Sequence, residues 1–134
     1  MGDSADPPDT QTVDPELAED VNGAIQTDPP RIVVGISGAS GVIHGARVLD
    51  ALAELGVESH LVVTRAALLT LSQETDLSAD ALSAKATVVH KLTDVGASIA
   101  SGSFRTLGMI IAPCSVRTMG EIATGVTSTL LTRA

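Results

Sequence analysis

Arg31-Ile-Val-Val-Gly-Ile-Ser-Gly-Ala-Ser-Gly41 is the stretch of sequence that decides the fold. Its first six residues are mostly β-branched and follow Pro29-Pro30, so they predict a buried strand over 31–36. Small residues follow as a turn. Apolar residues then recur at helical spacing from Val42 to Leu55, and Gly56 ends that pattern. A strand, a glycine-rich turn and a helix in this order open a parallel α/β sheet.

The same alternation of strands and helices continues to the end of the chain. Thr64, Ser78 and Ser115 each stand where a helix N-cap is expected. We predict a Ser- and Gly-rich loop over 97–106, strands over 57–63, 87–90 and 107–112, and helices over 65–71, 78–84, 115–123 and 126–133. This order predicts an α/β fold with a parallel sheet and helices on both of its faces.

Charge divides the chain into two parts. Residues 1–30 hold eight of the 16 acidic residues and no Lys or Arg, so the net charge of −8 belongs to this segment. Five of the six prolines also lie there. We predict a disordered, acidic, Pro-rich tail over 1–30 and one domain over 31–134. A short helix from Asp14 to Ile25 is the alternative for the tail.

Several classes of protein are disfavoured by composition. The body has no basic run, so nucleic acid is not an expected partner. No signal peptide and no apolar run of membrane-spanning length is present, which predicts a cytoplasmic protein with no membrane span. Cys114 is the single cysteine, and the three histidines lack the spacing of metal ligands, so we expect neither a disulfide nor a metal.

Three features with binding chemistry directly follow predicted strands. They are the turn at Gly38–Gly41, Thr64, and the segment Pro113–Thr118. Since the carboxyl ends of parallel strands meet at one edge of the sheet, we expect all three to gather there. Glycine N–H groups, hydroxyls and helix N-termini suit an anion, and phosphate is the natural candidate.

Common nucleotide-binding and hydrolase motifs are absent. The chain has no Gly-x-x-x-x-Gly-Lys-Ser/Thr and no Gly-x-Ser-x-Gly, and the spacing of Gly38, Gly41 and Gly45 departs from the dinucleotide fingerprint. Arg65, after the second strand, could accommodate a 2′-phosphate, so an NADP-dependent reductase is an alternative. From residue type alone, Glu74 is a solvated carboxylate and Cys114 a small packed residue.

Five motifs together resemble the UbiX-type flavin prenyltransferases in order and spacing. They are Val34-Gly-Ile-Ser-Gly-Ala-Ser-Gly41, Leu71-Ser-Gln-Glu-Thr-Asp76, Ser101-Gly-Ser-Phe104, Gly108-Met-Ile-Ile-Ala-Pro-Cys-Ser115 and Leu130-Leu-Thr-Arg-Ala134. The resemblance implies a Rossmann-like, flavodoxin-like fold in a homo-oligomer, a dodecamer in the family. It implies transfer of a dimethylallyl group from dimethylallyl phosphate to FMN, without a metal. The product serves UbiD-type decarboxylases.

The resemblance also assigns roles to residues. The flavin motif falls on Gly38, Ala39 and Ser40, and a further flavin contact falls on Thr64. The helix start of the family's Ser-x-Lys-Thr motif falls on the four consecutive residues Ser115, Val116, Arg117 and Thr118. Ser40 and Glu74 are implicated in catalysis at the prenyl phosphate. Arg117 replaces the usual Lys, and His44 stands where many relatives have Tyr.

Family members continue beyond Arg133-Ala134, so the resemblance implies a domain truncated at its C-terminus. The further part carries a Lys, an Arg-Glu pair and a Tyr that hold flavin and prenyl phosphate. We therefore expect this chain to bind flavin weakly and to turn over poorly. The alternatives are a non-catalytic flavin-binding or assembly subunit, a truncated inactive fragment, and the NADP-dependent reductase.

Overall fold

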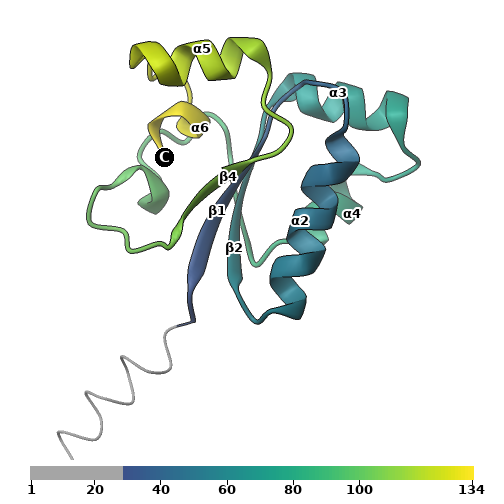
Figure 1. Ribbon diagram of the computed structural model, residues 1–134, viewed down its shortest axis with the longest axis horizontal. Helices are drawn as coiled ribbons and strands as arrows, with labels where there is room; N and C mark the ends of the chain where they lie inside the picture. Colours follow the sequence, from purple (N-terminus) through teal and green to yellow (C-terminus); the bar gives the residue numbers. More distant parts are fainter. Residues whose placement is uncertain (1–28) are drawn as a thin grey trace, which may run out of the picture.

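A computed structural model describes residues 29–134 and shows one parallel sheet with helices packed around it (Figure 1). The sheet has four strands in the order β3-β2-β1-β4. The elements are β1 (Arg31–Ile36), α2 (Val42–Glu54), β2 (Glu58–Val63), α3 (Arg65–Glu74), α4 (Ala79–Ala84), β3 (Val88–His90), the 3-10 turn η2 (Ser98–Ala100), β4 (Gly108–Ile111), α5 (Val116–Thr124) and α6 (Leu130–Arg133). The predicted fold class is confirmed.

The opening strand lies at the centre of the sheet. β1 pairs in parallel with β2, from Arg31↔Glu58 to Ile36↔Val63, and with β4, from Ile32↔Gly108 to Gly35↔Ile111. Its side chains alternate between the two faces of the sheet. Val34 and Ile36 pack under α2, α3 and α4, whereas Val33 packs under α6 and η2. The apolar run at 31–36 therefore supplies the core on both faces.

The second core cluster explains how a very short helix forms. α6 has four residues, too few to be stable as an isolated helix. Leu130 and Leu131 are fully buried against Val62 and Ile99. Burial of each leucine stabilises the fold by about 1.5–3 kcal/mol, which decides the position of α6 by packing rather than by helix propensity.

All three predicted N-caps are confirmed. The side chains of Thr64, Ser78 and Ser115 accept hydrogen bonds from the backbone N–H groups of Ala67, Ala81 and Thr118. Each bond satisfies one of the free N–H groups at the start of a helix. The same caps fix where α3, α4 and α5 begin.

Two predicted helices differ from the observed ones by more than one residue at an end. The helix predicted from 65 to 71 continues to Glu74, where Thr75 leaves the helical conformation. The helix predicted over 126–133 is confined to Leu130–Arg133. Gly125 ends α5 in the left-handed conformation at φ 76°, and the side chain of Thr132 binds the Thr129 N–H to start α6. Residues between them are therefore not helical.

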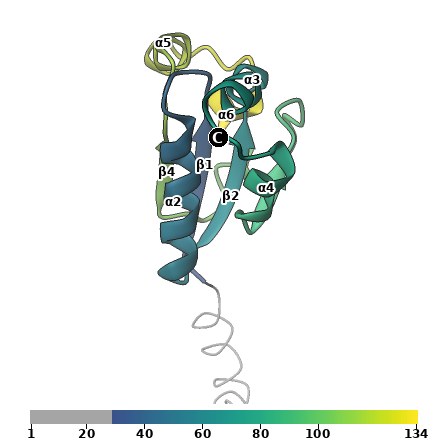
Figure 2. The ribbon, with the colours of Figure 1, turned by 90° about the vertical axis from the view of Figure 1, so that its right-hand side faces the viewer.

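The carboxyl ends of the strands lie at one edge of the molecule. Figures 1 and 2 both show α3 and α5 at this edge, at the top of each view. The opposite edge carries the start of β1. Residues 1–28 lie outside the described part of the chain, so the predicted tail and the alternative helix at Asp14–Ile25 stay untested. Within residues 29–134, no helix is long and apolar enough to cross a membrane.

Candidate functional site at the carboxyl edge of the sheet

A pocket of about 370 Å³ opens at the carboxyl edge of the sheet. Its volume is within the range of small-molecule sites. The walls come from the ends of β1, β2 and β4 and from the segments after β3 and α5. They are lined by Ser37, Gly38, Thr64, Arg65, Ala66, Leu92, Ser115, Arg117, Thr118, Glu121, Ser128 and Thr129. The predicted convergence of three strand-end features is therefore confirmed.

Ser37 joins the turn after β1 to the turn after β4. Its hydroxyl donates to the Pro113 carbonyl at 2.8 Å and accepts from the Ser115 N–H at 2.6 Å. Its own N–H also donates to the Pro113 carbonyl at 3.1 Å. Ser37 is 1% exposed. Because buried polar groups are costly when unpaired, these bonds fix the two turns to each other.

Gly38 allows the turn to lie directly against the start of α3. A Cβ atom at this position would clash with the Cβ of Ala66 and would lie 3.0 Å from the Ala66 carbonyl carbon. Any larger residue would have to push α3 away from β1. The absence of a side chain at Gly38 thus allows the first turn to pack directly against the start of α3.

Two helix N-termini point to the pocket. α3 starts after Thr64 and α5 starts after Ser115, and both capping residues line the pocket. Thr118 in the first turn of α5 is buried, and its hydroxyl accepts a hydrogen bond from Ser115 Oγ at 3.0 Å. N-terminal N–H groups and the helix dipole favour a negative charge. The pocket therefore suits an anionic group such as a phosphate.

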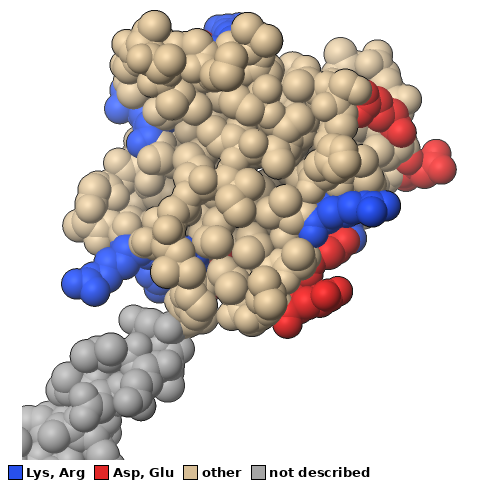
Figure 3. Space-filling model, viewed as in Figure 1, with Lys and Arg blue, Asp and Glu red and all other residues tan. Residues whose placement is uncertain are grey.

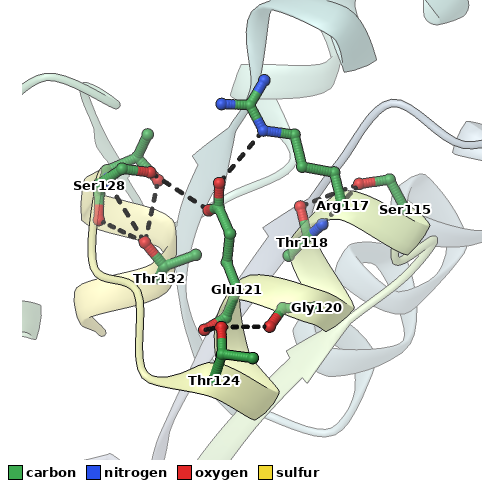
Figure 4. A network of polar contacts seen from close by, with 9 residues as sticks. Ser115, Arg117, Thr118, Gly120, Glu121, Thr124, Ser128 and Thr132 are labelled. Carbon is green, nitrogen blue, oxygen red and sulfur yellow. Dashed lines mark hydrogen bonds and ion pairs between the residues drawn. The ribbon is translucent and has the colours of Figure 1, made fainter.

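Arg117 adds a positive charge, and a carboxylate holds its side chain (Figure 4). Arg117 Nε donates to Glu121 Oε2 at 3.1 Å, and Ser128 Oγ donates to Glu121 Oε1 at 3.2 Å. Glu121 has a side chain that is 17% exposed, whereas that of Arg117 is 85% exposed. The terminal nitrogens of the guanidinium point away from Glu121 in Figure 4. They remain available to a ligand.

Ser40 and Glu74 meet at the start of α2. Ser40 Oγ donates to Glu74 Oε2 at 2.7 Å, and the Gly41 N–H donates to Glu74 Oε1 at 2.9 Å. The bond from Ser40, followed by those from the backbone of Gly41 and Val42, lowers the pKa of Glu74 below its usual value. Glu74 is thus a carboxylate that caps α2, which has no side-chain cap of its own at Gly41.

The predicted site residues fall into two groups in the structure. Gly38, Thr64, Ser115, Arg117 and Thr118 line the pocket together. The remaining predicted residues lie outside its lining: Ala39, Ser40, Glu74 and Val116. The sequence predicted a phosphate cradle at the turn before α2, and the carboxylate of Glu74 holds the Gly41 N–H there. The helices that begin at the pocket are instead α3 and α5.

The pocket also contains residues that sequence reasoning missed. Sequence alone places Ser37 in a turn, and Glu121 and Ser128 in two predicted helices, without a binding role for any of them. Leu92 and Thr129 come from segments without a motif. The one available signal was the i, i+4 spacing of Arg117 and Glu121 on a helix, which is the spacing of an ion pair.

Comparison with known proteins identifies the family. The family model described as Flavoprotein matches residues 24–134. The chain belongs to the flavoprotein family. This flavoprotein is 56% identical over 104 residues to the flavin prenyltransferase UbiX of Thauera aromatica, covering 78% of this chain and 54% of that one. It is 52% identical over 105 residues to UbiX of Escherichia coli K12, covering 78% and 56%.

Other relatives extend the similarity to eukaryotes and to solved structures. The mitochondrial flavin prenyltransferase PAD1 of Saccharomyces cerevisiae is 44% identical over 122 residues, covering 89% of this chain and 50% of that one. The crystal structure of AnUbiX (PadA1) in complex with FMN and dimethylallyl pyrophosphate matches with a TM-score of 0.78 and 43% identity, covering 78% of this chain and 56% of that one. These matches confirm the UbiX-type resemblance.

A second solved structure is described as a dodecameric FMN-dependent UbiX-like decarboxylase from Escherichia coli O157:H7. It matches with a TM-score of 0.75 and 42% identity, covering 77% of this chain and 57% of that one. This flavoprotein chain spans about half the length of the curated relatives it matches. These relatives do not favour the NADP-dependent reductase or the non-catalytic subunit.

Proposed function

We propose that this chain forms the flavin-phosphate part of a flavin prenyltransferase site, with FMN as the bound flavin and dimethylallyl phosphate as the prenyl donor. The observation that carries the proposal is the pocket in which the starts of α3 and α5 meet Arg117. One solved relative is described as a complex with FMN and dimethylallyl pyrophosphate, which supports the choice of ligands.

The residues of the pocket fit an FMN phosphate. The hydroxyls of Thr64 and Thr118 can donate to it, the first backbone N–H groups of α3 and α5 add further donors, and Arg117 offers charge. Gly38 allows the first turn to pack against the start of α3 beside the pocket. Leu92 and Ala66 supply apolar surface beside these polar groups. We propose that the remaining predicted flavin contacts, Ala39 and Val116, act through their backbone.

Ser40 and Glu74 are proposed as the proton-handling pair. FMN supplies the atoms that accept the prenyl group, and the donor's phosphate is the leaving group. Ser40 donates its proton to Glu74 in a short hydrogen bond, so its oxygen is directed to accept a proton in turn. The lowered pKa of Glu74 keeps it ionised at neutral pH but makes it a weak base. Its main role is therefore to orient and polarise Ser40.

The assembly is proposed to be a homo-oligomer. The outer face of α5 exposes Val116, Met119 and Ile122, of which Val116 is 80% exposed. Figure 3 shows that the face of the molecule over α5, α6 and β4 has few charged side chains. Exposed apolar surface of this kind is typical of an interface. The dodecameric relative supports the same proposal, and light scattering after size exclusion tests it.

One experiment tests the activity directly. The chain is mixed with FMN and dimethylallyl phosphate under anaerobic conditions, and the flavin is followed by absorbance and mass. We expect weak but saturable FMN binding and a slow increase of the flavin mass by one prenyl group. FMN that binds no more tightly than riboflavin would contradict the proposed phosphate site. Three further statements stay predictions. A UbiD-type decarboxylase uses the product, the chain is cytoplasmic, and the reaction needs no metal.

A metal requirement has no structural support among residues 29–134. No group of three or more His, Cys, Asp or Glu residues in this range is arranged to hold a metal ion. Dialysis against a chelator before the assay is the corresponding measurement. We expect the rate of prenyl transfer to be unchanged.

A further inference from the structure

A buried polar cluster crosses the sheet face on the side of α6, away from the residues of the proposed site. His60 on β2 is 5% exposed. Its Nε2 lies 2.8 Å from Glu58 Oε1, and its Nδ1 lies 2.9 Å from Nε2 of His90 on β3. Arg31 Nε donates to the same Glu58 oxygen at 2.9 Å. The cluster thus joins three neighbouring strands.

The loop before β4 closes over this cluster. The Phe104 ring meets the edge of His60 with ring centroids 5.1 Å apart, and the Arg31 guanidinium lies 5.1 Å from the Phe104 centroid. η2 contains no ionisable residue. Arg133 of α6 and Lys91, which follows His90 in the chain, are exposed. The charged groups that face the two histidines are Arg31, Glu58 and Asp94.

Hydrogen-bond chemistry limits how many protons the two rings can hold. A carboxylate only accepts, so His60 Nε2 carries a proton and donates it to Glu58. The bond between the two rings then needs one N–H and one lone pair. It forms when both rings are neutral or when one of them is charged. Two imidazolium rings would place two N–H groups against each other, and the bond would be lost.

The strand that carries His90 leads directly to a wall of the pocket. β3 has only three residues and pairs with β2 alone in the described sheet, and after it Leu92 packs against the core cluster that includes Leu130 and Leu131. Two residues beyond His90, the Leu92 carbonyl accepts a hydrogen bond of 3.0 Å from the Leu130 N–H. Leu92 and Thr129 line the pocket. The position of this wall therefore depends on where β3 ends.

We propose that His60 and His90 form a one-proton latch, which holds the β3 side of the pocket in place while at most one of the two rings is charged and releases it when both are. The latch acts on the pocket as a positioning device. Only its effect on ligand affinity rests on the proposed function. Burial, together with the charge of His60, lowers the pKa of His90, which agrees with a second proton being resisted.

The test uses the full chain labelled with ¹⁵N and two substitutions at His90. Imidazole nitrogen shifts report the protonation of each ring between pH 8 and pH 5. The protection factor of the Leu130 amide, corrected for intrinsic exchange, reports the wall of the pocket. His90→Gln keeps an amide N–H that can donate to His60 Nδ1 but cannot become charged. His90→Ala removes the bond at every pH.

For the wild type we expect coupled titration of the two rings and loss of Leu130 protection as the second proton binds. His90→Gln should keep that protection at pH 5, and His90→Ala should lower it at pH 7.5 as well. FMN affinity of the wild type should fall between pH 7.5 and pH 5 by about fivefold more than that of His90→Gln. The His90→Gln chain corrects for titration of the FMN phosphate itself.

Independent titration of the two rings, with Leu130 protection unchanged, would overturn the latch. Equal pH dependence of FMN affinity in the wild type and His90→Gln would overturn its link to the pocket. If the wild type binds no FMN at any pH, the proposed function fails instead. The imidazole shifts and the Leu130 protection still decide the latch in that case.

Discussion

The N–H of Ser115 donates a hydrogen bond of 2.6 Å to the hydroxyl of Ser37, although 78 positions separate the two residues in the chain. This bond connects the carboxyl end of β1 to the start of α5. Because Ser115 is also the N-cap of α5, the same contact orients the helix whose N-terminus faces the pocket. The geometry of the proposed phosphate site therefore depends on a residue that is not itself a predicted ligand.

Ser37→Ala tests this connection. The substitution leaves the half-buried Ser115 N–H and Pro113 carbonyl short of one partner each, so we expect a loss of about 2 kcal/mol in the free energy of unfolding. FMN affinity should fall as well, because α5 loses its anchor. Urea unfolding and fluorescence titration measure the two effects. Ser98→Ala, at an exposed serine of η2, is the control and should change neither.

Gly38→Ala tests the contact between the first turn and α3. The added Cβ clashes with Ala66, so we expect destabilisation by about 1–3 kcal/mol and weaker flavin binding. The double substitution Gly38→Ala/Ala66→Gly should recover part of the loss. Gly120→Ala is the matched control, since a Cβ there meets no atom within 4 Å. In a helix it should be neutral or stabilising by up to about 1 kcal/mol. Equal effects at the two glycines would contradict the contact.

Glu74→Gln separates orientation of Ser40 from flavin binding. The amide oxygen can still accept from the Gly41 N–H, but the side chain no longer carries the charge that polarises Ser40. We expect the rate of prenyl transfer to fall about 10²–10⁴-fold while the Kd for FMN changes little. Asp76→Asn, at an exposed carboxylate two residues later, should leave the rate unchanged. A similar fall in both variants would indicate a general effect of charge.

Arg117→Gln tests the charge at the start of α5. Loss of a charged hydrogen bond to phosphate should weaken FMN binding about tenfold to a hundredfold and leave riboflavin binding unchanged. Because the Arg117 side chain is 85% exposed, its pair with Glu121 should contribute less than about 0.5 kcal/mol to stability. Arg47→Gln, on the exposed side of α2, is the control. Equal weakening of FMN and riboflavin would place the phosphate elsewhere.

Acid should destabilise the chain through Glu58. The hydrogen bond from His60, with the bond and charge of Arg31, lowers the pKa of Glu58 below 4.5 in the folded state. The unfolded chain then binds protons more readily, so the stabilisation is complete above about pH 4.5 and is lost as the pH falls through the folded-state pKa. Unfolding free energies of the wild type and Glu58→Gln should therefore differ most near pH 7.

The size of that difference is limited by partial exposure of the pair. The Glu58 side chain is 21% exposed and that of Arg31 is 30% exposed, so we expect about 1–2 kcal/mol at pH 7 and a smaller gap at pH 3. Glu54→Gln, at an exposed carboxylate of α2, is the control. A gap that stays constant with pH would show that the effect of Glu58→Gln comes from packing.

Local sequence was sufficient to predict most helices and strands, because apolar runs and N-cap residues act within a few positions of the chain. The run at 31–36 predicted β1 with its observed bounds, and Thr64, Ser78 and Ser115 predicted three helix starts. The helix predicted over 126–133 was wrong at its start because an apolar pattern does not reveal the capping box by which α6 begins only after Thr129. Such positions are decided by backbone conformation and by the burial of Leu130 and Leu131.

The sequence alone determined the α/β alternation, the place of the site at the carboxyl ends of the strands, and the resemblance to flavin prenyltransferases. Each of these depends on residue order and period, which are properties of the chain itself. The tertiary structure alone decided that Ser37 accepts a hydrogen bond at the start of α5, that Glu74 caps α2, and that His60 and His90 are hydrogen-bonded between neighbouring strands. These contacts join residues at least 30 positions apart, and hydrogen bonds of that kind exist only once the sheet sets the strands side by side.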